Sequence, residues 1–145
     1  MRSLPEPPYR PADHPVDVGQ RTEAAVIAEL VKRGYVVLTP FGVNHRYDLV
    51  LDCGGTFIRA QCKTGRLRNG AVRFKTQSVR CNSRRAYIRG YAGEIDVFLV
   101  YCAETGGTYA VPVDEAQSEG TLRVAPTKNG QAQGIRWAAE YELPA

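Results

Sequence analysis

The sequence predicts one α/β (α+β) domain, in which an N-terminal helix precedes a mixed central sheet accompanied by further short helices. Three observations support this prediction. Residues 18–33 repeat apolar side chains at steps of three and four, as one face of a helix does. Short segments of alternating character follow, separated by glycine turns, and residues 95–102 are nearly all apolar, as in a buried central strand. A chain of 145 residues can build one core without disulfides.

The N-terminal helix is predicted over residues 18–33, with Gly34 as its stop signal. Glu23 lies in its first turns. The face expected to pack on the sheet is an apolar stripe made of Ala24, Ile27, Ala28 and Val31.

Strands in the first half of the chain are predicted from apolar or alternating runs bounded by turn residues. They cover residues 35–40, 47–52, 56–63 and 71–76. The second and third of these form a hairpin around Gly54 and Gly55. Residues 78–91 are basic and polar, and we expect a loop there with at most one helical turn.

The second half of the chain is centred on the apolar strand at residues 95–102. Residues 108–113 are expected to pair with it across a turn. Three shorter elements follow: a helix over residues 112–119, an edge strand over 122–124, and a loop leading to a short helix or strand around Trp137.

Charge is distributed unevenly along the chain. Residues 53–93 contain ten of the 19 basic residues and no Asp or Glu, so all 15 acidic residues lie elsewhere. A solvated surface normally mixes both signs, whereas a cationic block on an otherwise acidic protein suits a polyanion. Arginine outnumbers lysine in this block, which favours phosphate or base contacts and hence a nucleic acid.

Other classes of protein are disfavoured. No run of 18 apolar residues exists, so we expect no membrane association. Residues 1–17 are rich in proline and lack the apolar core of a secretory signal, so they are predicted to form a flexible arm outside a domain spanning 18–145. The four cysteines show no CxxC spacing, which argues against a zinc site and fits reduced thiols in the cytoplasm.

The predicted hairpin gathers polar side chains on one face. Alternation places Asp48 on one face of its strand, and Gln61 and Lys63 together on one face of the partner strand. If the register sets Asp48 opposite Gln61, an acid, an amide and an ammonium meet within a few ångströms. Carboxylate, amide and backbone carbonyl oxygens are ligands that suit Mg²⁺. The alternative is that Asp48 and Lys63 form a surface ion pair of small value.

These residues resemble a known family. Glu23 on a first helix, then Asp48, then the strand containing Gln61 and Lys63 look like the core of the PD-(D/E)XK nucleases. The QxK form resembles the branch of group I intron-associated homing endonucleases. The similarity runs from about residue 18 to 143 and includes the segments GYVVLTPFGVNHRYDLVLD, QCKTGRLRNGAVRFKTQS and GIRWAAEYEL. It implies a restriction-endonuclease-like core with the order α-β-β-β-α-β.

The resemblance also implies roles for the hairpin residues. Asp48 would be the central ligand of Mg²⁺, with Mn²⁺ as a substitute. Gln61, the Cys62 backbone carbonyl and Glu23, directly or through water, would complete the metal shell, and Lys63 would position or activate the attacking water. Two positions depart from the family pattern, because Tyr47 replaces the proline before the Asp and Gln61 replaces an acid. The second departure removes one negative charge from the metal site.

The cationic block follows the predicted site along the chain and is expected to bind double-stranded DNA. The candidate DNA-binding residues are Arg66, Arg68, Arg73, Lys75, Gln77, Ser78, Arg80, Asn82, Arg84, Arg85 and Arg89. Ser78 and Asn82 serve equally well as turn caps.

The function expected from these features is metal-dependent hydrolysis of DNA phosphodiester bonds. One site cuts one strand, so we expect a homodimer or homotetramer. Two alternatives remain: a Holliday junction resolvase or repair nuclease with the same core, and a catalytically inactive DNA-binding module.

Overall fold

The computed structural model describes residues 3–5, 14–81, 83–116 and 119–144. Its single α-helix is α1 (Pro15–Lys32), and two short 3-10 helices cover Val113–Glu115 and Ala138–Glu140. The strands are β1 (Val36–Leu38), β2 (Leu49–Asp52), β3 (Phe57–Arg68), β4 (Ala71–Lys75), β5 (Ser78–Cys81), β6 (Ala86–Arg89), β7 (Val97–Cys102), β8 (Gly107–Pro112) and β9 (Glu119–Arg123). No helix among the described residues is long and apolar enough to span a membrane.

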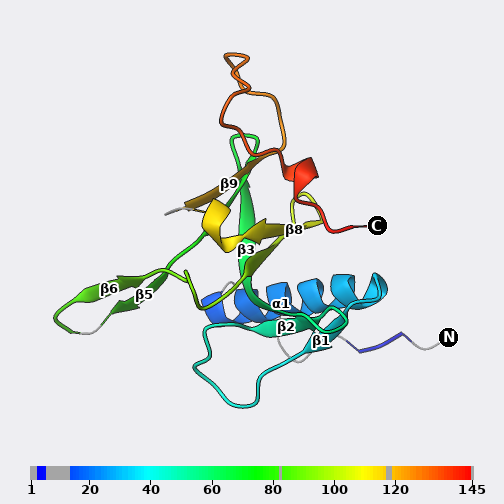
Figure 1. Ribbon diagram of the computed structural model, residues 1–145. Coiled ribbons are helices and arrows are strands. Elements are labelled where there is room, and N and C mark those ends of the chain that lie inside the picture. Colours follow the sequence, from blue (N-terminus) through cyan, green and yellow to red (C-terminus); the bar gives the residue numbers. More distant parts are fainter. Residues whose placement is uncertain (1–2, 6–13, 82, 117–118, 145) are drawn as a thin grey trace.

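Strand β3 organises the main sheet, which has seven strands. Its first residues pair antiparallel with β2, its middle pairs parallel with β7, and its last residues pair antiparallel with β4. β1 extends the sheet beyond β2, β9 beyond β4, and β8 beyond β7 (Figure 1). The predicted mixed central sheet is therefore confirmed, including the pairing of β7 with β8 across a turn.

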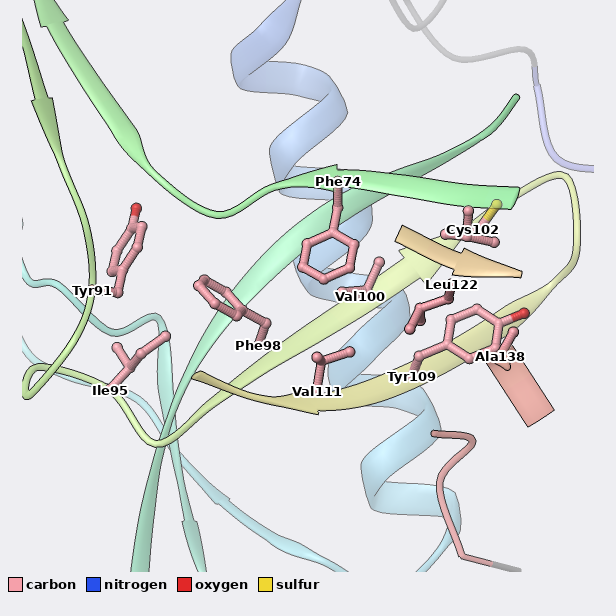
Figure 2. Close-up of a cluster of buried hydrophobic side chains, with 11 residues drawn as sticks. Phe74, Tyr91, Ile95, Phe98, Val100, Cys102, Tyr109, Val111, Leu122 and Ala138 are labelled. Atoms are coloured by element: carbon pink, nitrogen blue, oxygen red, sulfur yellow. The ribbon is translucent and has the colours of Figure 1, made fainter. Parts of the chain in front are cut away.

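Strand β7 lies in the centre of the sheet and is buried on both faces. Leu99 packs toward α1, whereas Phe98 and Val100 belong to a second cluster on the opposite face. That second cluster runs from Tyr91 and Ile95 at one end to Tyr109 and Ala138 at the other (Figure 2). The nearly uninterrupted apolar sequence of this strand follows from burial on both sides.

Helix α1 packs on the sheet by a different face from the predicted one. Val26 and Leu30 are fully buried, whereas Val31, in the predicted stripe, is 58% exposed. The buried face contacts Leu49, Leu51, Ala60 and Leu99. Burying Val26 and Leu30 removes more apolar area from water than burying the smaller Ala24 and Ala28, which lie exposed.

The helix also begins three residues earlier than predicted. Its N-cap is His14, whose Nδ1 accepts a hydrogen bond from the Val16 backbone N–H at 3.3 Å. Pro15 follows at the first helical position, where its missing N–H costs nothing. Residues 15–17, which sequence reasoning placed in the proline-rich arm, are therefore helical.

Two predicted helices are wrong. The order α-β-β-β-α-β requires a helix before β7, but residues 78–91 contain the β5–β6 hairpin instead, which extends away from the main sheet (Figure 1). Val79, Tyr87 and Ile88 are strand-forming residues, and their strand preference prevails in a segment that reads as polar by composition. In place of the helix predicted over residues 112–119, the described residues form a 3-10 turn at Val113–Glu115, and Glu119 begins β9. Gly120 lies inside β9 because its lack of a side chain leaves room for the Phe74 ring. Within the described residues the sheet therefore has one α-helix, on one face.

Candidate active site

The point where β2 and β3 diverge places Asp48 over the edge of β3. The last pair of the β2–β3 ladder is Leu49 with Ala60, and the Asp48 N–H donates to the Ala60 carbonyl at 2.8 Å. Asp48 lies just before β2, and its Oδ2 accepts a hydrogen bond from the Cys62 N–H at 2.8 Å. The Asp48 carboxylate is thereby held against β3 at Cys62, the residue between Gln61 and Lys63.

An open pocket of about 540 Å³ lies between α1 and this hairpin. Its lining residues are Val16, Gly19, Gln20, Thr22, Glu23, Asp48, Gln61, Cys62 and Thr64. The hydroxyls of Thr22 and Thr64 lie 2.6 Å apart and join α1 to β3. This bond fixes the helix turn from which Glu23 projects.

The pocket contains acidic groups that lie close enough together for one to affect the pKa of another. Burial raises the pKa of Glu23, and the neighbouring Asp48 carboxylate raises it further. Burial also raises the pKa of Asp48, although the Cys62 N–H and the Lys63 charge act in the opposite direction. The Cys62 thiol has a raised pKa because it is buried and faces both carboxylates. Two carboxylates in one half-buried pocket gain from a shared cation.

The pocket offers oxygen ligands for such a cation. Besides the two carboxylates, Gln61 provides an amide oxygen. In an extended strand the N–H and C=O of one residue point to the same side, so the Cys62 carbonyl faces the Asp48 edge of β3. The described residues hold no cluster of three His, Cys, Asp or Glu side chains suited to a metal. The donor set is therefore two carboxylates, one amide and one carbonyl, all hard ligands that suit Mg²⁺.

The ammonium of Lys63 contacts Tyr91, a residue that does not line this pocket. Its Nζ lies 3.2 Å from the Tyr91 hydroxyl and 4.8 Å from the centre of the Tyr91 ring. Its charge still reaches Asp48, whose pKa it lowers. Of the four predicted catalytic residues, Glu23, Asp48 and Gln61 therefore share the pocket lining, whereas Lys63 lies outside it with its ammonium at Tyr91.

Sequence reasoning missed the residues around Lys63. Tyr91 is buried, and the Arg46 guanidinium carbon lies 4.0 Å above the centre of its ring. Arg46 is fixed in turn by Glu94, by the Ser78 hydroxyl at 2.9 Å and by the Gly90 carbonyl. The proximity of Arg46 to Asp48 in the sequence was the only available signal, because the other contacts join residues more than 25 positions apart.

Four of the predicted DNA-binding cations share one exposed face of the β3–β4 ribbon: Arg66, Arg68, Arg73 and Lys75. Arg66 stands directly opposite Arg73 in the ladder, and like charges in that position destabilise a sheet. Lys75 stands opposite Glu119 on β9. The ribbon thus carries a charge arrangement that a bound polyanion would relieve.

The other DNA-binding candidates lie on or beside the β5–β6 hairpin. Arg84 and Arg85 are exposed near its turn, and Gln77 is half-buried just before β5. Arg89 forms an ion pair with Glu94, and Ser78 bonds Arg46 and the Arg89 carbonyl, so these two residues hold the hairpin to the core. Arg80 belongs to β5, but its side chain lies outside the described part of the structure, as does all of Asn82.

The family model of the PD-(D/E)XK endonucleases matches residues 14–144, which includes α1, every strand and the pocket. The chain belongs to the PD-(D/E)XK endonuclease family. Both Asp48 and Gln61 line the pocket within the matched range.

The chain is also similar to a solved structure. The structure of a bacterial homing endonuclease, I-Ssp6803I, matches with a TM-score of 0.72 and 27% sequence identity, over 89% of this chain and 88% of that chain. The resemblance drawn from the sequence is thereby confirmed. A comparison with curated protein sequences finds no match.

Proposed function

We propose that this PD-(D/E)XK endonuclease is a Mg²⁺-dependent endodeoxyribonuclease that hydrolyses phosphodiester bonds in double-stranded DNA, as a homing-type enzyme. One observation carries the proposal: Glu23, Asp48 and Gln61 line one pocket in which burial raises the pKa of both carboxyl groups and the Asp48 charge raises that of Glu23 further. Such a pocket suits a divalent cation and a polyanionic substrate.

The ligands for Mg²⁺ would be Asp48, the Gln61 amide oxygen, the Cys62 carbonyl and Glu23, directly or through water, with Mn²⁺ as a substitute. A bound divalent cation would acidify water and neutralise charge on the scissile phosphate. The amide of Gln61 adds no charge to this set. Metal affinity therefore depends on Glu23 and Asp48.

Lys63 would act on the phosphate and on the attacking water. Its ammonium, beside Asp48, orients the water and offsets the charge that develops on the pentavalent phosphorane. Asp48 is fixed for this role by the Cys62 N–H, and Glu23 by the helix that Thr22 joins to β3.

DNA binding would use the exposed face of the β3–β4 ribbon and the β5–β6 hairpin. The opposed pair Arg66 and Arg73 favours a partner that brings negative charge. Each released counterion adds to the affinity, so binding should fall steeply with salt. Arg84 and Arg85 would contact the same DNA from the hairpin.

A double-strand break requires two sites, because each chain has one. The working enzyme is therefore a homodimer or homotetramer, acting in the cytoplasm with its thiols reduced. Light scattering of the purified protein, alone and with DNA, measures the assembly.

Plasmid nicking tests the proposal. Wild type, Asp48→Ala and Lys63→Ala are incubated with supercoiled DNA and Mg²⁺, and DNA affinity is measured separately in Ca²⁺. Asp52→Ala is a matched control, since Asp52 lies at the far end of β2 from Asp48 and accepts a hydrogen bond from the Gly54 N–H. We expect wild type and Asp52→Ala to cleave, and both site variants to bind DNA but lose at least about 100-fold in rate.

Failure of wild type to cleave linear, supercoiled or junction DNA, with binding intact, would contradict the proposal and leave a DNA-binding module. Cleavage confined to four-way junctions would identify a resolvase instead.

A further inference from the structure

We infer that Tyr91 is the positioning residue for Lys63, holding its ammonium next to but outside the Glu23–Asp48 pocket during phosphodiester hydrolysis. This inference rests on the proposed function, because it concerns how the same site orients its lysine. Tyr91 does not line the pocket, and it lies outside the motif that defines the family.

The first argument is the geometry around the ammonium. Lysine has a flexible four-carbon stem, so a catalytic ammonium needs a partner that limits where its tip can lie. Tyr91 provides two contacts of a kind that suits a cation: a hydroxyl oxygen 3.2 Å from Nζ and a ring centre 4.8 Å from it.

The second argument is that Tyr91 is itself held rigidly. Its ring is 6% exposed and meets the Phe98 ring edge to face, with centroids 5.6 Å apart. Figure 2 shows Tyr91 at one end of the apolar cluster, beside Ile95 and Phe98. Phe98 lies on β7, and in the β3–β7 register it pairs with Gln61, so the same two strands set the pocket and the aromatic support.

The third argument concerns Arg46. Its guanidinium lies over the Tyr91 ring and is anchored by Glu94, Ser78 and Gly90. A residue used only to fill the core would not need a second cation at its ring. The Glu94 carboxylate offsets the charge of Arg46, which allows two cations to share one aromatic ring.

The fourth argument concerns where the ammonium of Lys63 lies. A lysine free to follow the electrostatic attraction alone would move toward Glu23 and Asp48, where an ammonium would merely replace the metal. The hydrogen bond to Tyr91 keeps Nζ out of the pocket lining while its charge still reaches Asp48. The pocket therefore stays open for a divalent cation.

The test is a double-mutant cycle on the full-length chain. Tyr91→Phe removes the hydroxyl but keeps the ring between Arg46 and Phe98. Lys63→Met keeps the length of the side chain and removes its charge. Steady-state cleavage of a DNA duplex with Mg²⁺ gives kcat and KM, and single-turnover cleavage gives the rate of the cleavage step, for wild type, each single variant and the pair.

Tyr109→Phe is the matched control. It removes another hydroxyl of the same core cluster, one that bonds Thr105 at 2.9 Å at the opposite end of the cluster (Figure 2). Thermal unfolding of both tyrosine variants measures the stability that each hydroxyl contributes.

We expect Tyr91→Phe to lower kcat roughly tenfold with KM for DNA unchanged, and Tyr109→Phe to cleave like wild type at comparable stability. In the Lys63→Met background, Tyr91→Phe should lower the rate no further, because it acts only through the lysine.

Three outcomes would overturn the inference. If wild type cleaves and Tyr91→Phe keeps the wild-type kcat, Tyr91 does not position the lysine. If Tyr91→Phe costs the same factor with and without Lys63, it acts elsewhere. If wild type cleaves no DNA, the proposed function fails first and the inference falls with it.

Discussion

Gln61 sets the charge of the pocket. Two carboxyl groups with raised pKa values already face each other there, and a third acid at position 61 would deepen the repulsion. An amide supplies a ligand oxygen without that cost. The pocket therefore carries less repulsion than three carboxylates would create.

Gln61→Glu should lower stability without metal and increase the stabilisation that Mg²⁺ provides. Without metal, the added carboxylate should lower the free energy of unfolding by about 1–3 kcal/mol. With Mg²⁺ the variant should gain more stability than wild type, because the cation then meets three carboxylates. Thermal unfolding in EDTA and in saturating Mg²⁺ measures both effects.

Gln131→Glu adds the same charge on an exposed loop and should change neither quantity. An equal Mg²⁺-induced shift in wild type and Gln61→Glu would argue against Gln61 as a metal ligand.

At the residue scale, sequence reasoning succeeded where contacts are local. Alternation and the turn at Gly54 and Gly55 predicted that Asp48 and Gln61 lie near each other, and both line the pocket. The contact of Lys63 with Tyr91 could not be predicted, since it spans 28 residues and depends on how β7 carries Phe98 beneath the ring.

At the element scale, helix α1 shows how a correct element can be predicted with the wrong face. Apolar residues occur on two overlapping stripes of this helix. The stripe with the larger side chains is buried, and Thr22 extends it because its hydroxyl bonds Thr64. A search for apolar periodicity that counts threonine as polar therefore does not assign Thr22 to the buried face.

Leu30→Ala and Val31→Ala distinguish the two faces. Leu30→Ala should lower the free energy of unfolding by about 2–5 kcal/mol, because it leaves a cavity under the helix. Val31→Ala should change it by less than about 0.5 kcal/mol. Chemical denaturation measures both values, and comparable losses would show that the helix packs in another orientation.

Strand β3 is the element that brings both halves of the site together. It contributes Gln61, Cys62 and Lys63, and along its length it pairs first with β2 and then with β4. Gly65 lies at the crossing, where a side chain would meet Val72 Cγ1 at 2.7 Å and Val100 Cγ1 at 2.9 Å. The sequence ended this strand at Lys63, because the basic residues that continue it read as surface rather than as sheet.

At the scale of the whole molecule, ion pairs attach the β5–β6 hairpin to the core. Arg46 beside the active site and Arg89 on β6 both bind Glu94, the first acid after the cationic block. The cationic block contains ten basic residues, of which eight are predicted from the sequence to bind DNA. One of these eight, Arg89, is paired with Glu94, and Arg59 of the same block is paired with Asp96.

The pH dependence of stability should report this attachment. Burial alone would raise the pKa of Glu94, but hydrogen bonds from Arg89 and Arg46 outweigh it and lower the pKa. A folded-state pKa below the unfolded value of about 4.3 stabilises the protein above that pH, and this contribution disappears as the pH falls through the folded-state pKa.

Glu94→Gln should therefore unfold at a lower temperature than wild type at neutral pH, and the difference should narrow as the pH falls below about 4. Melting curves across this range measure it, with exposed Glu142→Gln as control. A difference that stays constant with pH would contradict the ion-pair explanation.

The central claim is that Glu23, Asp48 and Gln61 form a divalent-cation site, and titration with Mn²⁺ followed by electron paramagnetic resonance tests it directly. Asp48→Asn keeps an oxygen to accept the Cys62 N–H but removes the charge, whereas Asp52→Asn makes the same change elsewhere on β2. The account predicts Mn²⁺ binding to wild type and Asp52→Asn, and its loss in Asp48→Asn. Equal binding to all three proteins, or none to wild type, would contradict it.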